Sequence, residues 1–363
     1  MTDLRPLVLP GRLGTPNMAL VDDPRADPRM LAAMEPLGMG ALPEPAPIGA
    51  DASLDVLLGF CDLAEAGFEG MFPAISAGLE PVGGVTSSVE TVTGVDGNEI
   101  TVYVHRPVNS AGPLPALIHL HGGGMVILEA AGAAFARWRD ELAATGLVVF
   151  GVEFRNGAGK HGPHPFPAGL DDCSSVLQWV SDNKDRFGVS TVVISGESGG
   201  GNLTLATTLK AKRDGRIAQI DGVYAQCPYI SNAYADRLPE LTSLYENDGY
   251  FLAGDMMAIM ARAYDPLRAH ASNPLAWPYY ATTADLEGLP PHVISVNQLD
   301  PLRDEGLAYF RKLLDAGVSA TSRTVNGTCH AGDCIFRVAM PDVYLATIRD
   351  IKSFADSLSL TRR

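Results

Sequence analysis

The sequence predicts an α/β fold with a mostly parallel central sheet and helices on both of its faces. Short apolar runs rich in β-branched residues alternate with helix-length segments from residue 116 onward, which is the pattern of strands joined by crossover helices. An antiparallel hairpin is predicted just before them. The 363 residues, 46% of them hydrophobic, suffice for one large domain with insertions.

The first 84 residues lack strand-like alternation and are predicted to be a helical appendage that contributes to a cap. A short helix is expected over residues 27–34. A second helix is expected over residues 51–66, where apolar residues recur at three- and four-residue spacings. Asp51 is placed to cap its start and Gly67 to end it.

The main domain is predicted to comprise residues 85–227 and 290–363. It opens with strands at residues 87–93 and 100–106 around Asp96-Gly97, a strong hairpin signal. Further strands are predicted at residues 116–120, 147–154, 191–195, 222–227, 292–299 and 320–325. The helices that alternate with them are predicted at residues 135–145, 168–187, 203–213, 305–316 and 338–358.

Residues 228–289 interrupt this alternation without a clear strand and are rich in Tyr, Met and Trp. We expect them to join the N-terminal segment in a cap over the carboxyl edge of the sheet. Their apolar residues near helical spacing could line a substrate pocket: Tyr250, Phe251, Met256, Met257, Met260 and Tyr264. For any one of these residues, the alternative role of packing the cap onto the main domain is at least as well supported.

Composition and charge exclude several classes of partner. A net charge of −15, from 42 acidic and 27 basic residues, disfavours nucleic acid and anionic membranes, because both bind basic patches. No apolar run reaches the length of about eighteen residues that crosses a bilayer. Residues 1–6 also lack the basic and apolar regions of a leader. We therefore expect a soluble cytoplasmic protein without stable membrane association.

The five cysteines form no C-x-x-C pair. Cys329 and Cys334 lie beside His330, which is the strongest hint of a metal site in the chain. No second ligand pair with suitable spacing follows, so reduced thiols and no metal are expected.

A candidate nucleophile lies where the strand at residues 191–195 meets the following helix. Gly196-Glu197-Ser198-Gly199-Gly200 has the G-x-S-x-G spacing of a nucleophile elbow, a strained turn in which side chains at the flanking glycines would clash. The same spacing is common by chance in glycine-rich sequences. Taken alone, the motif fits a plain strand-to-helix turn equally well.

A second motif, His121-Gly122-Gly123-Gly124, follows the strand at residues 116–120. Consecutive glycines at the end of a strand let backbone N–H groups point into open space, as a preformed anion site requires. A phosphate-binding loop would need Lys and Ser or Thr after the glycines, and Met125-Val126-Ile127 supplies neither. His121 is expected to anchor this loop rather than to act as a base.

A serine hydroxyl needs a histidine base and a carboxylate that orients the base, and candidates for both follow later strands. Asp300 follows the strand at residues 292–299, and His330 alone among the eight histidines lies on a loop after a late strand. Asp304 and Glu305 compete with Asp300, but acids at the start of a helix also suit its dipole. Glu197 could tune the site, although a structural hydrogen bond is the favoured role.

Taken together, His121 to Gly124, Gly196 to Asn202, Asp300 to Glu305 and His330 resemble the motifs of bacterial hormone-sensitive-lipase-like carboxylesterases, from about residue 85 to the C-terminus. The resemblance implies an α/β-hydrolase fold with a two-segment cap, a triad of Ser198, His330 and Asp300, and no metal or organic cofactor. It also implies an oxyanion hole made by the N–H groups of Gly123, Gly124 and Gly199.

Two positions depart from that pattern. The usual Asp-Ser-Ala of the elbow is Glu197-Ser198-Gly199, and Met125 replaces the aromatic residue that often follows the three glycines. Glu197 and Met125 are therefore counted with the candidate residues of the substrate pocket.

The resulting hypothesis is a serine carboxylesterase that hydrolyses small to medium acyl esters of small molecules through an acyl-enzyme. Ser198 attacks the ester carbonyl, His330 takes its proton, and Asp300 orients the imidazole. The same site could serve a lactonase, an amidase or an acyltransferase. A non-catalytic ligand-binding protein is disfavoured because all three triad members are present, and the sequence leaves open whether the chain forms a homodimer.

Overall fold

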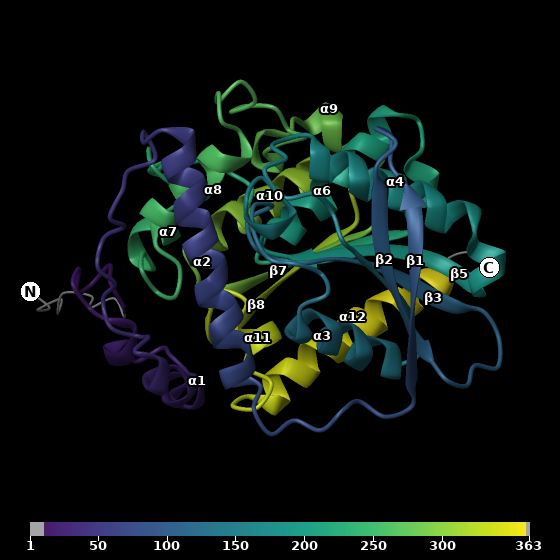
Figure 1. Cartoon of the computed structure of the whole chain (residues 1–363), viewed down its shortest axis with the longest axis horizontal. Helices are drawn as coiled ribbons and strands as arrows, with labels where there is room; N and C mark the ends of the chain where they lie inside the picture. The colour runs from purple at the N-terminus through teal and green to yellow at the C-terminus, as the bar shows by residue number, and fades with distance from the viewer. Residues whose placement is uncertain (1–10, 361–363) are drawn as a thin grey trace, which may run out of the picture.

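The computed structural model describes residues 11–360, whose strands form one eight-stranded sheet in the order β1-β2-β4-β3-β5-β6-β7-β8 (Figure 1). The strands are β1 (Val85–Thr93), β2 (Glu99–Pro107), β3 (Leu114–Leu120), β4 (Val148–Val152), β5 (Val189–Glu197), β6 (Gly222–Gln226), β7 (His292–Leu299) and β8 (Ala320–Cys329). Strand β2 pairs antiparallel with β1 and β4, and all other neighbours are parallel. The predicted mostly parallel sheet is confirmed.

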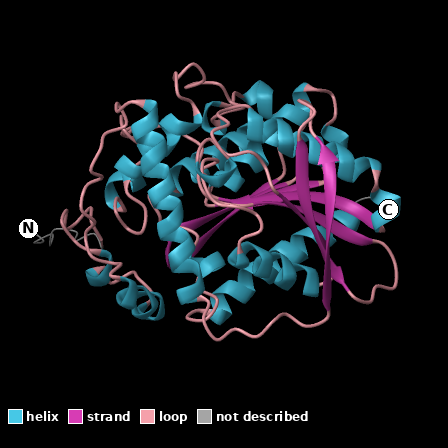
Figure 2. Cartoon of the chain, viewed as in Figure 1, coloured by secondary structure: helices cyan, strands magenta, loops and turns pink. Residues whose placement is uncertain are grey.

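Helices cover both faces of the sheet because its central strands bury side chains on both sides (Figure 2). On one face, α3 (Ala133–Ala144) and α12 (Pro341–Leu360) pack against Leu117, Val149 and Val193. On the other face, α4 (Ala168–Asp182), α6 (Gly199–Arg213) and α10 (Arg303–Asp315) pack into the larger core. This layered arrangement places the carboxyl ends of the parallel strands at one edge of the molecule.

The predicted strands and helices of the main domain are present, with different limits next to the motifs. Strand β5 continues to Glu197, and α6 begins at Gly199 rather than near Leu203, so the turn between them is only one residue long. Strand β8 runs on to Cys329, directly before His330. The predicted helix at residues 168–187 is divided into α4 and α5 (Lys184–Phe187) at Asn183.

Helix α2 (Leu54–Ile75) differs from its prediction at both ends. Its N-cap is Ser53 rather than Asp51, and it continues through Gly67, so the predicted cap at Asp51 and the predicted end at Gly67 are both wrong. Beyond Gly67, Phe68 and Phe72 pack against both hydrophobic clusters that meet at this helix. This tertiary packing outweighs the weak tendency of one exposed glycine to end a helix.

The insertion at residues 228–289 contains α7 (Ser243–Glu246), α8 (Gly254–Tyr264), a 3-10 helix (Pro278–Tyr280) and α9 (Thr283–Leu286). Helix α8 lies against α2, so the insertion and the N-terminal segment are neighbours (Figure 1). The remaining helices are α1 (Pro28–Met34), α11 (Gly332–Ile335) and four 3-10 helices, at Leu20–Asp22, Glu35–Leu37, Gly159–His161 and Ile217–Gln219.

Helix α1 confirms the short helix predicted near the N-terminus. The Asp27 side chain accepts a hydrogen bond from the Arg29 N–H and caps it. Met30 and Met34 pack in a separate hydrophobic cluster with Leu299 and Cys329, at the ends of β7 and β8. Residues 1–6, which were predicted to contain no leader, lie outside the described residues. Among residues 11–360, no helix combines the length and apolar character needed to cross a bilayer.

Candidate active site

Ser198 is the single residue between β5 and α6, and it has a strained backbone conformation with φ 58° and ψ −119°. Left-handed φ values are costly for residues other than glycine and persist where the surroundings enforce them. The Ser198 N–H donates to the Gln226 carbonyl at 3.0 Å, which ties the turn to β6. A Cβ on Gly200 would lie 1.8 Å from the Leu120 carbonyl oxygen, so only glycine fits there. The G-x-S-x-G motif is thus a sharp elbow.

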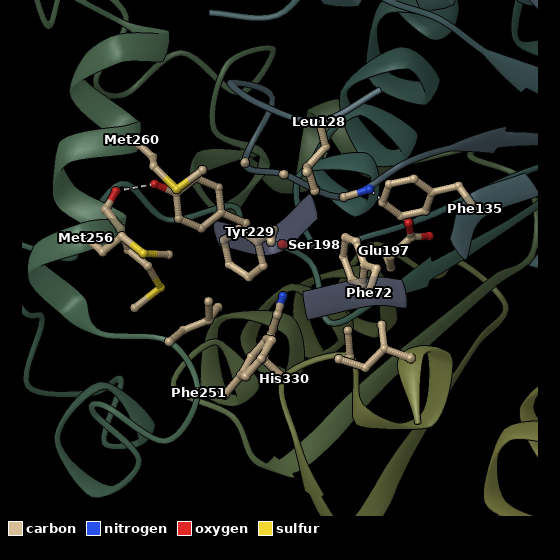
Figure 3. A pocket seen from close by; sticks show the side chains of 18 residues that line it. Phe72, Leu128, Phe135, Glu197, Ser198, Tyr229, Phe251, Met256, Met260 and His330 are labelled. Carbon is tan, nitrogen blue, oxygen red and sulfur yellow. Dashed lines mark hydrogen bonds between the residues drawn. The ribbon is translucent and has the colours of Figure 1, made fainter. Parts of the chain in front are cut away.

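The structure brings Asp300 and His330 together at the ends of β7 and β8. The His330 Nδ1 lies 2.8 Å from Asp300 Oδ2, and both side chains are buried. Because a carboxylate only accepts hydrogen bonds, Nδ1 carries a proton, so in the neutral imidazole Nε2 is the acceptor. The other Asp300 oxygen accepts from the Leu302 N–H at 2.8 Å. The His330 ring nitrogen is directed toward the Ser198 hydroxyl (Figure 3).

The competing acids Asp304 and Glu305 hold other groups. Asp304 accepts from the Ser243 N–H at 2.8 Å and pairs with Arg303. Glu305 is fully buried and accepts from the Ile230 N–H at 2.6 Å and the Tyr234 hydroxyl at 2.9 Å. Burial raises the pKa of Glu305 to about 8. Neither carboxylate contacts His330, so the geometry favours the sequence preference for Asp300.

The segment at residues 121–128 follows β3 and turns back on itself; it is called the oxyanion loop below, after the oxyanion hole predicted at its glycines. The Gly123 carbonyl accepts from the N–H groups of Val126 and Ile127, both at 3.0 Å. The N–H groups of Gly123, Gly124 and Gly199 donate to no protein acceptor within residues 11–360. A Cβ on Gly199 would lie 2.6 Å from Gly124 N, so the backbones of the elbow and of the oxyanion loop touch next to Ser198.

His121 and Glu197 hold the oxyanion loop in place. The His121 Nδ1–H donates to the Gly122 carbonyl at 2.7 Å, and its ring stacks on Phe154 at a centroid distance of 4.2 Å. Burial lowers the pKa of His121 to about 3. Glu197 accepts from the Gly122 N–H at 2.8 Å and lies 3.0 Å from His119 Nε2. Both side chains thus make the structural hydrogen bonds that the sequence analysis favoured.

A cavity of about 70 Å³ lies above Ser198. Most of its lining is apolar and comes from α2, α3, α8 and the loops between strands and helices: Phe68, Phe72, Gly122, Gly123, Gly124, Leu128, Phe135, Glu197, Ser198, Tyr229, Phe251, Leu252, Met256, Met257, Met260, His330, Ala331 and Ile335. Figure 3 shows Met256, Met260 and Tyr229 on one side of Ser198, and Phe72 and Phe135 on the other.

The predicted pocket residues divide into two groups. Glu197 and the cap residues Phe251, Met256, Met257 and Met260 line the cavity, whereas Met125, Tyr250 and Tyr264 do not. The Tyr250 hydroxyl donates to Asp23 Oδ2 at 3.0 Å, so this side chain packs against the N-terminal segment. Met125 belongs to the oxyanion loop itself, and its side chain is almost fully buried.

Several lining residues were missed by the sequence analysis. Phe68 and Phe72 were missed because the predicted helix ended before them, although the structure extends α2 to Ile75. An aromatic pair four residues apart is a recognisable sign of a buried helix face. Leu128 and Phe135 follow the glycine motif, and no sequence pattern marks either of them as a pocket residue. Tyr229 follows β6, and its N–H donates to the Ser198 carbonyl at 3.1 Å.

Within residues 11–360, one group of potential metal ligands lies close together, comprising Cys227, Asp300 and His330, with ligand atoms within 4.8 Å of one another. Burial raises the pKa of the Cys227 thiol well above its usual value. A metal ion here would have to replace the hydrogen bond between His330 and Asp300. These residues therefore suit proton transfer better than metal ligation.

Comparison with known proteins places the chain in a family. A family model for the alpha/beta hydrolase fold matches residues 117–332. Carboxylesterase NlhH of Mycobacterium tuberculosis is 30% identical over 276 residues, which cover 74% of this chain and 82% of that protein. The solved structure of a brefeldin A esterase, described as a bacterial homologue of human hormone-sensitive lipase, is 45% identical with a TM-score of 0.94, covering 98% of this chain and 100% of that one.

A second solved structure, of esterase Est22, is 36% identical with a TM-score of 0.82 and covers 93% of this chain and 99% of that one. The residues that the family model matches include the elbow, the oxyanion loop, Asp300 and His330. The chain belongs to the hormone-sensitive-lipase-like esterases, a family of carboxylic ester hydrolases with the α/β-hydrolase fold.

Proposed function

We propose that this esterase hydrolyses small to medium, uncharged acyl esters through a covalent acyl-enzyme, with Ser198 as nucleophile. The observation that carries the proposal is the buried hydrogen bond of 2.8 Å between His330 and Asp300, with the imidazole directed at a serine in a strained elbow (Figure 3). A weak nucleophile such as a hydroxyl requires this arrangement at neutral pH.

In the proposed mechanism, Ser198 Oγ adds to the ester carbonyl carbon while His330 Nε2 takes its proton. Asp300 holds the imidazole in the tautomer that can accept this proton and stabilises the imidazolium. The N–H groups of Gly123, Gly124 and Gly199 stabilise the oxyanion, each by about 3 kcal/mol. His330 then protonates the leaving alcohol, and water, deprotonated by the same imidazole, releases the acid.

The lining of the cavity supports an uncharged substrate. Both Glu197 oxygens are engaged, by the Gly122 N–H and by His119, and the Tyr229 hydroxyl donates to the Met257 carbonyl. No spare polar side chain among the described lining residues remains to neutralise a charged substrate. One structure of the relative Est22 contains p-nitrophenol, which supports aryl esters as assay substrates.

We also propose that residues 1–84 and 228–289 form the cap of this site, over a catalytic domain of residues 85–227 and 290–363. The contact between α2 and α8 supports this division, as do the cavity residues that both helices contribute. The strongly negative net charge supports a small-molecule substrate over nucleic acid or anionic membranes as a partner.

The Ser198→Ala variant tests this proposal. We expect kcat/KM for p-nitrophenyl butyrate to fall about 10⁴-fold or more, because the acyl-enzyme can no longer form. Labelling by a fluorophosphonate probe should disappear as well. The matched control is Ser195→Ala in the neighbouring strand, where the serine is buried away from the cavity and activity should remain. Undiminished hydrolysis by Ser198→Ala would refute the proposed nucleophile.

A further inference from the structure

We propose that Glu65 of helix α2 is a positioning residue for the oxyanion loop, so that the N-terminal segment is part of the catalytic apparatus and not only a cover for the pocket. This inference rests on the proposed function, because it assigns Glu65 a role in holding the amides that would bind the oxyanion. Glu65 itself lies outside the lining of the cavity.

The Glu65 carboxylate is 4% exposed and binds two backbone amides of the main domain. Its Oε1 accepts from the Leu128 N–H at 2.6 Å, and its Oε2 accepts from the Lys160 N–H at 3.0 Å. Within residues 11–360 it has no ion pair, because the Lys160 ammonium contacts Glu69 and Glu129 instead. A buried carboxylate is costly unless it is well hydrogen-bonded, so these two amides are its main stabilising partners.

Leu128 ends the turn that contains the proposed oxyanion amides. The Gly123 carbonyl accepts from Val126 and Ile127, and the Ile127 carbonyl oxygen would lie only 2.1 Å from a Cβ on Gly123. The turn is therefore packed tightly enough that a shift of Leu128 must move Gly123. The Leu128 carbonyl is held in turn by Asn156 Nδ2 at 2.6 Å.

The oxyanion loop is thus held at both ends by buried carboxylates that come from different parts of the chain. Glu197 of the elbow holds the Gly122 N–H, and Glu65 of α2 holds the Leu128 N–H. Helix α2 also contributes Phe68 and Phe72 to the cavity. The same helix therefore shapes the substrate site and fixes the far end of the loop, so a displacement of α2 would weaken catalysis as well as binding.

Glu69 provides a matched control on the same helix. It lies one turn after Glu65 and, like Glu65, contacts Lys160. Glu65 binds the Lys160 backbone N–H, whereas Glu69 pairs with the Lys160 ammonium. Its side chain is 33% exposed, and it makes no contact with the oxyanion loop. Replacing Glu69 therefore removes a carboxylate that links α2 to Lys160, and it leaves the hydrogen bond between Glu65 and the Leu128 N–H intact.

The experiment compares Glu65→Gln with Glu69→Gln, using p-nitrophenyl butyrate and two ketone inhibitors that carry the same alkyl chain. A trifluoromethyl ketone accepts Ser198 Oγ at its carbonyl carbon, with the serine proton passing to His330, and places a negative oxygen in the oxyanion hole. The matching methyl ketone binds without this addition. Glutamine keeps the size of Glu65 and one acceptor oxygen, so this variant should fold.

For Glu65→Gln we expect kcat to fall about tenfold or more with KM within about twofold, because misplaced oxyanion donors act on the transition state. The inhibition constant of the trifluoromethyl ketone should rise by the same factor, and that of the methyl ketone should not change. Glu69→Gln should match the wild type in all four values. Rates are referred to active sites titrated with a fluorophosphonate, so that a loss of folded protein does not count as a loss of kcat.

The inference is overturned if Glu65→Gln keeps the wild-type kcat per titrated site and the wild-type affinity for the trifluoromethyl ketone. A lowered melting temperature with unchanged kinetics would give Glu65 a role in stability alone and would equally overturn it. Failure of the proposed function has a separate signature. In that case Ser198→Ala would bind the trifluoromethyl ketone as tightly as the wild type.

Discussion

The elbow at Ser198 and helix α2 are both rich in glycine, but glycine has opposite meanings in the two regions. In the elbow, a Cβ on Gly200 would lie 1.8 Å from the Leu120 carbonyl oxygen, and a Cβ on Gly199 would lie 2.4 Å from Met125 N. In α2, a Cβ on Gly59, Gly67 or Gly70 would meet no atom within 4 Å. The elbow needs glycine because backbones touch there, whereas the exposed face of α2 merely tolerates it.

This difference explains what each region contributes to the site. The elbow and the oxyanion loop position backbone N–H groups, and close backbone approach leaves few permitted sequences. Helix α2 contributes side chains, through Phe68 and Phe72 in the cavity and Glu65 at the oxyanion loop. The apolar contacts of Phe68 and Phe72 can be made by many residues, so the region carries no compact motif.

Among the substitutions that test this comparison, the largest effect is expected for Gly200→Ala. The added methyl group has no room against the carbonyl oxygens of Leu120 and His121, which belong to the backbone of β3 and the oxyanion loop. We expect the free energy of unfolding to fall by at least about 3 kcal/mol, from overpacking against backbone atoms. Urea unfolding measures the loss, and kcat per titrated site should fall about 100-fold because the elbow and the loop move apart.

The control for this variant is Gly59→Ala, where the same methyl group enters open space on α2. It should lose neither stability nor activity. If Gly200→Ala unfolds at the wild-type urea concentration, the elbow can open without cost, and close packing is not the reason for glycine at this position.

The sheet and the triad candidates were predictable because each depends on a local pattern. Buried parallel strands are short β-branched runs, and the carboxyl ends of such strands meet at one edge. Asp300 follows the buried strand β7 and His330 follows the parallel edge strand β8, so their approach to Ser198 follows from topology. The fold and the order of its strands were enough to predict that these two residues lie close together.

The supporting contacts could not be predicted because they join residues far apart in the sequence. Glu65 is 63 residues from Leu128, and nothing near Glu65 in the sequence distinguishes it from the half-buried Glu69 one turn later. Tyr250 and Phe251 are adjacent, and only the fold decides that the first packs on Asp23 and the second lines the cavity. Propensity also failed at Gly67, where the packing of later aromatic residues continues the helix.

A smaller effect, on selectivity, is expected where the cap supplies side chains. Met256 of α8 lines the cavity and is only partly buried, so Met256→Ala should enlarge the pocket at little cost in stability. We expect the ratio of kcat/KM for p-nitrophenyl octanoate to that for the acetate to rise about tenfold. Leu267→Ala is the control, because Leu267 lies in the same insertion and is 86% exposed. An unchanged ratio in Met256→Ala would remove α8 from the determinants of chain length.

The smallest effect is expected for Gly67→Ala, and it tests the revised length of α2. Gly67 is exposed in the interior of the helix with open space around it, so alanine should raise the free energy of unfolding by about 0.5–1 kcal/mol through the lower entropy of the unfolded chain. Urea unfolding with an unchanged m-value measures the gain, and kcat and KM should equal those of the wild type. A loss of stability would mean that glycine ends the helix here, as the sequence pattern had predicted. In that case Phe68 and Phe72 would have to reach the pocket from a loop, and the contrast between the elbow and α2 would disappear.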